Sequence, residues 1–187
     1  MEKGKPDSIY YFLKHRKYWK ELRDDVLKEI GEIYKNDLSD FNDFVRISEH
    51  YNLTQANYLR LQEGFSKPKE LIPYFALTLE RCGAMLMEEF SKSDDGNYKE
   101  DAKKCYQLSL KLNPFLVPSY GALAYIFAFS DNNVEIAIDY CNKGIKAFKN
   151  LREIPHGELS NYNKALLSDP SAFEHLKELK SELIGKK

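Results

Sequence analysis

The clearest fold signal in the sequence is DAKKCYQLSLKLNP, residues 101–114. Small Ala102 is followed by large Tyr106 four residues later and by small Ser109 three residues after that, which places all three on one side of a helix. Pro114 then ends the segment, because a proline inside a helix removes a hydrogen bond and clashes with the preceding turn. Small residues let a partner helix approach closely, and the large residue fills the remaining gap. The pattern therefore predicts a helix packed tightly on a neighbour.

A second copy of this pattern follows 35 residues later. The matched pairs are Ala102 with Ala137, Tyr106 with Cys141, Ser109 with Gly144 and Leu110 with Ile145. Both copies follow a polar turn, at residues 95–97 and 131–133, whereas Lys149 stands where the second copy would have its proline. Self-similarity at such a period predicts two similar helical units in tandem.

Each copy is preceded by another helix with a pattern of its own. The later one carries Tyr120, Leu123-Ala124 and Phe127, and the earlier one carries Leu79, Cys82-Gly83 and Leu86. These two patterns lie 41 residues apart rather than 35. We assign the six extra residues of the earlier unit to a longer loop around Asp94-Asp95-Gly96.

The paired patterns resemble tetratricopeptide (TPR) repeats over roughly residues 71–148. The resemblance implies an all-α fold in which antiparallel helical hairpins stack as a short TPR-like solenoid. Two units leave both ends of such a stack uncovered, so we expect N- and C-terminal capping helices. The expected organisation is an N-terminal helical region at 1–66, two TPR-like repeats at 67–150 and C-terminal capping helices at 151–187.

Apolar spacing is helical almost throughout the chain, and glycines and prolines fall between the periodic segments. It predicts helices at about residues 9–34, 39–51, 54–64, 68–90, 98–112, 118–129, 134–148, 158–167 and 171–184. Residues 91–97 are predicted to form an exposed loop and residues 151–157 an irregular segment.

In the TPR family, ligands usually lie on the concave surface formed by the first helices. Carried over by position, this groove would include Leu77, Arg81, Met87, Gly121, Ala122, Tyr125 and Phe129. Gly121 and Tyr125 replace the Lys and Asn of the family's carboxylate clamp, so we expect no clamp. The groove would be apolar and aromatic, with Arg81 as its main cation. The implied function is non-catalytic binding of a partner helix or peptide, as an adaptor, scaffold or chaperone-like module.

Two other arrangements fit the same residues. Tyr125 and Phe129 could pack against the chain's own C-terminal helix instead of a partner. Met85 and Met87, which lie near aromatic residues, would suit a homodimer face as well as a foreign ligand.

Residues 47–61 are similar to a helix-turn-helix, which makes a transcriptional regulator with a TPR-like sensor region the alternative function. Small Ser48, turn residue Asn52 and helix-starting Thr54 have suitable spacings. Against this, the second helix carries one cation, Arg60, and the preceding region is acidic around Asp40 and its neighbours, which repels phosphate. We therefore expect a protein partner rather than nucleic acid.

Composition and charge argue against nucleic-acid-binding and membrane proteins. A net charge of −1 gives no overall attraction to nucleic acid or anionic lipid. The N-terminus is polar, and no run of about 20 apolar residues is present, so we expect a soluble cytoplasmic protein that does not enter a membrane.

Motifs of enzyme chemistry are absent from the sequence. Three widely spaced cysteines form no CxxC pair, and four histidines (His15, His50, His156 and His175) show no metal-ligand spacing. Cys82, Cys105 and Cys141 fall at or beside packed repeat positions, which favours a structural role. We expect no catalysis, no metal and no cofactor.

Overall fold

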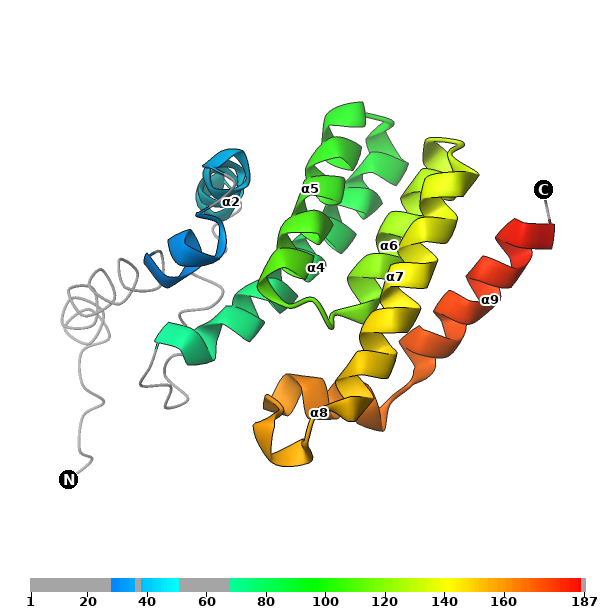
Figure 1. Cartoon of the computed structure of the whole chain (residues 1–187). Helices are drawn as coiled ribbons and strands as arrows, with labels where there is room; N and C mark the ends of the chain where they lie inside the picture. The colour runs from blue at the N-terminus through cyan, green and yellow to red at the C-terminus, as the bar shows by residue number, and fades with distance from the viewer. Residues whose placement is uncertain (1–27, 36–37, 51–67, 186–187) are drawn as a thin grey trace, which may run out of the picture.

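The computed structural model of the chain describes residues 28–35, 38–50 and 68–185, and within these ranges every regular element is a helix (Figure 1). The elements are a helical segment at residues 28–33, α2 (Leu38–His50), α4 (Pro68–Ser93), α5 (Gly96–Leu112), α6 (Val117–Tyr125), the π-helical η1 (Ile126–Ser130), α7 (Val134–Glu153), the 3-10 helix η2 (His156–Glu158), α8 (Asn161–Ser168) and α9 (Ser171–Gly185). The predicted all-α class is confirmed. The predicted helix at 54–64 and most of the one at 9–34 lie outside the described residues. No helix in the described ranges is both long and apolar enough to cross a membrane.

Two hairpins form the centre of the molecule, α4 with α5, and α6 and η1 with α7 (Figure 1). Their turns are built alike. Asp94 and Asn132 have φ angles of 55° and 51°, in the left-handed region that Asp and Asn adopt more readily than most residues. The next residues, Asp95 and Asn133, cap the second helix, because their side-chain oxygens accept backbone hydrogen bonds of 2.9 and 3.1 Å. The same turn chemistry thus closes both hairpins.

The loop predicted at residues 91–97 is wrong, because α4 continues to Ser93 and α5 begins at Gly96. The extra length of the first hairpin is helical. Polar residues that suggested a loop form an exposed last turn of α4, in which Lys92 pairs with Glu88 and Glu89 at 2.8 and 3.0 Å. Likewise α7 continues to Glu153, into the segment predicted to be irregular.

Glycines allow the close helix approaches that the repeat pattern predicts. A Cβ atom on Gly83 would lie 2.9 Å from Cζ of Tyr106, which places the Tyr106 ring directly over α4. A Cβ atom on Gly144 would lie 2.5 Å from Cδ2 of Leu176 and 2.8 Å from Cβ of Tyr120. Both distances are too short for real carbon atoms, so α7 packs on α6 and α9 only because residue 144 has no side chain.

The two C-terminal helices, predicted as capping helices, pack on the second hairpin. α9 packs on α7 and α6, and the main partner of α8 is α7. Leu176 and Leu183 of α9 are buried, and the ring of Phe173 stacks on Phe148 with centroids 4.4 Å apart. α9 therefore covers the open side of the second hairpin alone, as Figure 1 shows at the C-terminal end.

The N-terminal side of the first hairpin is covered by residues 28–35 and α2. Ile30, Phe44 and Ile47 are buried in the same core cluster as residues of α4 and α5. The hydroxyl of Tyr34 donates a buried hydrogen bond of 3.0 Å to the carbonyl of Leu108. The core therefore extends continuously from α2 into the first hairpin.

Candidate binding groove

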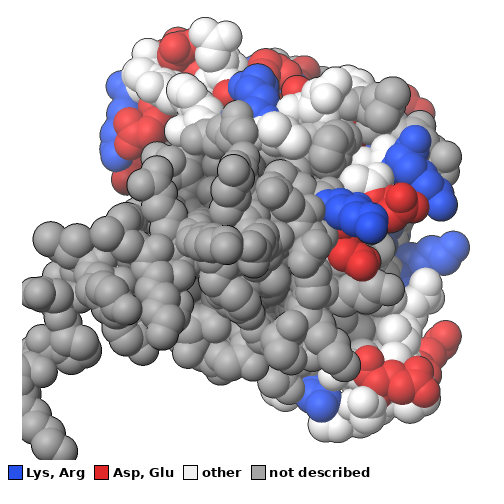
Figure 2. Space-filling view, turned by 90° about the vertical axis from the view of Figure 1, so that its left-hand side faces the viewer, with Lys and Arg blue, Asp and Glu red and all other residues white. Residues whose placement is uncertain are grey.

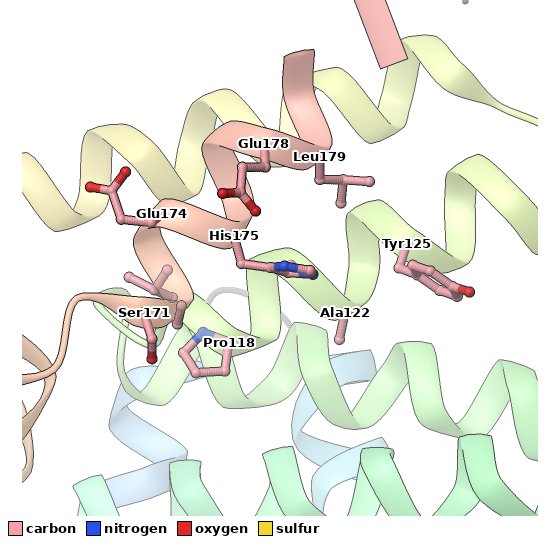
Figure 3. A pocket seen from close by; sticks show the side chains of 11 residues that line it. Pro118, Ala122, Tyr125, Ser171, Glu174, His175, Glu178 and Leu179 are labelled. Atoms are coloured by element: carbon pink, nitrogen blue, oxygen red, sulfur yellow. The ribbon is translucent and has the colours of Figure 1, made fainter. Parts of the chain in front are cut away.

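A pocket of about 760 Å³ lies between α6 and α9 (Figure 3). Its walls are Val117, Pro118, Gly121, Ala122 and Tyr125 from α6, and Ser171, Ala172, Glu174, His175, Glu178 and Leu179 from α9. Gly121 and Ala122 leave open space on the α6 side of the pocket because their side chains are absent or small. A Cβ atom on Gly121 would meet only Leu176, at 3.8 Å. In Figure 3 the His175 ring extends from α9 toward the α6 side of the pocket.

A second pocket of about 440 Å³ lies on the other side of α6, against α4. It is lined by Met87, Glu88, Phe90, Ser91, Tyr106, Ala122, Tyr125, Ile126 and Ser130. Ala122 and Tyr125 belong to both pockets. The two hollows are therefore halves of one surface, with Tyr125 as the ridge between them, and we call their combined lining the Tyr125 groove.

An aromatic pair stands exposed at this ridge. Tyr125 is 55% exposed and Phe129 is 43% exposed, with ring centroids 4.6 Å apart. Phe129 belongs to η1, whose wider π-helical turn ends with a 3.1 Å bond from the Asp131 amide to the Ile126 carbonyl. Such π-helical turns are rare and frequently occur at functional sites.

Five of the seven predicted groove residues come together on this surface. Met87, Gly121, Ala122 and Tyr125 line the groove, and the ring of Phe129 lies tilted against that of Tyr125. Leu77, half-buried, and Arg81, exposed, lie nearer the start of α4 and line neither pocket. Arg81 therefore contributes no cation to these two pockets, and its role as the main cation of a wider groove stays a prediction.

Sequence reasoning missed the α9 wall. Ser171, Glu174, His175 and Glu178 recur at the spacings i, i+3, i+4 and i+7, which places them on one face of α9. The leucine stripe of α9 packs on the second hairpin, whereas this second face looks into the groove. The same spacing in the sequence was a usable signal, although nothing in it says which helix the face would meet.

The charged side chains in the groove are carboxylates. Glu88 bonds to Lys92 at 2.8 Å, and this hydrogen bond lowers the pKa of Glu88. Glu174 bonds to Lys177 at 2.7 Å. Beside the groove on α4, burial raises the pKa of the Glu80 carboxyl, and the charge of Arg81 opposes the shift. Acidic groups therefore stand on both walls, α4 and α9.

The competing interpretation, in which the chain's own C-terminal helix covers the aromatic pair, does not describe this arrangement. α9 forms one wall of the groove, and its buried leucines belong to the core cluster of the second hairpin. Tyr125 and Phe129 stay exposed beside it.

The cysteines are buried, as a packing role requires. Burial raises the pKa of the Cys141 thiol to about 11. The hydrogen bond with Cys82, together with burial, raises the pKa of Cys105. These two thiols are therefore protonated at neutral pH. Within residues 28–35, 38–50 and 68–185, no group of three or more His, Cys, Asp or Glu side chains is placed to hold a metal ion.

The helix-turn-helix candidate, residues 47–61, lies outside the described residues beyond position 50. Of the acidic residues before it, Asp40 and Asp43 are described and Asp37 is not, and the expected repulsion of phosphate by the described pair needs correction. Asp43 bonds to Lys104 at 2.8 Å, and Asp40 pairs with Lys104 and Lys111 of α5, so these charges are compensated within the molecule. Figure 2 shows described acidic and basic side chains next to each other on this side.

Comparison with known proteins returns no family assignment. No family model matches the chain, and neither a curated protein nor a solved structure shows significant similarity to it.

Proposed function

We propose that the protein is a non-catalytic interaction module whose Tyr125 groove holds a helix or peptide of a partner protein. The observation that carries the proposal is the exposed Tyr125–Phe129 pair, which stands between two adjoining pockets. Exposed contiguous apolar surface on a folded domain marks interaction sites, and aromatic residues dominate the binding energy of such sites.

The architecture supports the proposal. We infer that the two hairpins are TPR-like units, with α9 in the position of the next first helix. Three features agree with this. In both turns an Asp or Asn with left-handed backbone precedes an Asp or Asn that caps the next helix, and neighbouring helices approach closely at Gly83 and Gly144. α9 also packs on both helices of the second hairpin. In such a stack α4, α6 with η1, and α9 would line one face, which is where the groove lies.

The dimensions of the groove suit several side chains of a partner segment. Pockets of about 760 and 440 Å³ fall in the range in which proteins bury ligand groups. An amphipathic helix docks by inserting apolar side chains from successive turns into such hollows. The ridge at Tyr125 would then lie between two inserted side chains.

The proposal is tested by affinity capture with the whole chain, followed by mass spectrometry. The test variant carries Tyr125→Ala and Phe129→Ala, and the matched control carries Ile136→Ala, an apolar residue of α7 that is 38% exposed and lines neither pocket. Partners retained by the wild type and the control should be lost from the test variant. Capture of the same partners by all three proteins would remove the groove from the function.

A second variant separates binding from folding. Gly121→Leu fills the α6–α9 pocket, yet the nearest atom to the new Cβ is 3.8 Å away. Replacing a helical glycine should also raise the free energy of unfolding by about 0.5–1 kcal/mol. Loss of partner binding in a protein that is at least as stable as the wild type supports the groove, whereas unchanged binding contradicts it.

A further inference from the structure

The lining of the Tyr125 groove has a one-sided charge. Glu88 stands on the α4 wall, Glu174 and Glu178 stand on the α9 wall, and none of the residues lining either pocket is Lys or Arg. The whole chain has a net charge of only −1, so this imbalance is local. A third hollow, of about 240 Å³, has the opposite character, because Lys143 and Lys146 line it.

The carboxylates differ in how far they are already neutralised. Glu88 and Glu174 each bond to a lysine one turn further along the same helix, at 2.8 and 2.7 Å. Glu178 has no ion pair or hydrogen bond with any described residue. An exposed carboxylate with no partner, beside an apolar hollow and an aromatic face, is suited to receive a cation that arrives with an apolar ligand.

We propose that the occupant of the Tyr125 groove is a cationic amphipathic segment of another protein, with apolar side chains in the two pockets and a Lys or Arg paired to Glu178. The proposal rests on the proposed function and adds the chemistry of the partner. Apolar side chains of the segment would cover the exposed ring of Tyr125, and its cation would pair with Glu178, the groove carboxylate without an ion pair among the described residues. An acidic segment would instead bring a like charge to Glu178, which disfavours binding.

The test uses the whole chain and two labelled peptides of about 18 residues, roughly five helical turns. One carries leucines along one helical face and lysines elsewhere, and its twin has glutamate at every lysine position. Binding is followed by fluorescence anisotropy at low and at physiological salt. The lysine peptide should bind at least about tenfold more tightly than the glutamate peptide, with a difference that shrinks as salt is added.

Two charge reversals on the same helix locate the effect. Glu178→Lys should weaken binding of the lysine peptide about tenfold, since it removes an attraction and adds a repulsion. The matched control is Glu182→Lys, an exposed residue one turn further along α9 that lines neither pocket, and it should change affinity less than about twofold.

The outcomes separate this inference from the proposed function. Equal binding of both peptides, abolished by Tyr125→Ala, overturns the cationic partner and leaves the groove in place. Equal weakening by both charge reversals also overturns it, because the attraction would then be diffuse. Binding that ignores Tyr125→Ala and Glu178→Lys alike overturns the groove itself. If neither peptide binds but a natural partner is captured in a Tyr125-dependent way, only the inference of a cationic partner segment is overturned.

Discussion

Replacing Gly83 with alanine should destabilise the protein, although alanine is the better helix former. The new Cβ would lie 2.9 Å from Cζ and 3.0 Å from Cε1 of Tyr106, whose side chain is 3% exposed and has little room to move. Overpacking of this kind costs about 1–3 kcal/mol, whereas the change from glycine to alanine inside a helix returns about 1 kcal/mol. The free energy of unfolding should therefore fall by about 1 kcal/mol.

The same substitution should become stabilising once Tyr106 is replaced by Cys, the residue at the matching position of the second hairpin. The three atoms nearest to the new Cβ all belong to the Tyr106 ring, so replacing the ring removes the three closest contacts. Tyr106→Cys alone should cost about 3–4 kcal/mol, as truncation of a buried aromatic does. In that background Gly83→Ala gains about 1 kcal/mol of helix propensity and about 0.8 kcal/mol from apolar burial. The coupling between the two sites should be about 2–3 kcal/mol.

Guanidinium unfolding of the four proteins, followed by circular dichroism, measures this coupling. Gly121→Ala is the control, because its nearest neighbour would be 3.8 Å away, and it should stabilise by up to about 1 kcal/mol in either background. A coupling below about 0.5 kcal/mol would show that the Tyr106 ring does not pack on Gly83.

Three further substitutions probe the rest of the fold. Leu176→Ala should lower the free energy of unfolding by about 2–5 kcal/mol and speed amide exchange throughout α9, and unchanged exchange there would contradict the packing of α9 on α7. Asp131→Asn should cost about 1 kcal/mol, because Asp131 binds two lysines of α5 at 2.7 and 2.9 Å. Burial acts to raise the pKa of Asp131, but these bonds outweigh it and hold the pKa below its usual value. The stability that the Asp131 carboxylate contributes is therefore complete above the ordinary carboxyl pKa of about 4 and is lost as the pH falls through the pKa of the folded protein. In urea titrations at a series of pH values, the free energies of unfolding of wild type and variant should converge in acid. Arg46→Ala should speed amide exchange in α2 without changing that of α9, since Arg46 binds Asp101 at 2.7 and 3.4 Å, and an equal change in both helices would refute a local role.

Helix positions were predictable where apolar spacing coincided with a capping residue. α5 was expected at 98–112 and occupies Gly96–Leu112, with Asp95 as its cap. The prediction failed at the end of α4, because an exposed helical turn and a loop have the same polar composition. In the helical turn at 91–93, Lys92 pairs with two glutamates on the preceding turn, and this geometry cannot be read from composition.

The candidate site also has a part that the sequence predicted and a part that it did not. Gly121, Ala122 and Tyr125 were predicted from the resemblance to TPR repeats, and all three line the α6–α9 pocket. The α9 wall was not, since α9 lies outside the two matched segments and its position is set by tertiary packing, including Leu176 over Gly144 and Phe173 on Phe148. A helix face shows its polarity in the sequence, but the neighbour it faces is set by packing elsewhere.

The two hairpins divide the side-chain volume between their first and second helices differently. In the first, Gly83 leaves a gap that the ring of Tyr106 fills. At the matching positions of the second, Ala124 and Cys141 are both fully buried in one core cluster, so the first helix carries more bulk and the second helix less. Compared position by position, tyrosine against cysteine looks like a mismatch, whereas each pair combines a small buried residue of the first helix with a buried residue of the second. A Gly83→Ala, Tyr106→Cys protein would therefore carry the residue pair of the second hairpin in the first, which is why those two substitutions should favour each other.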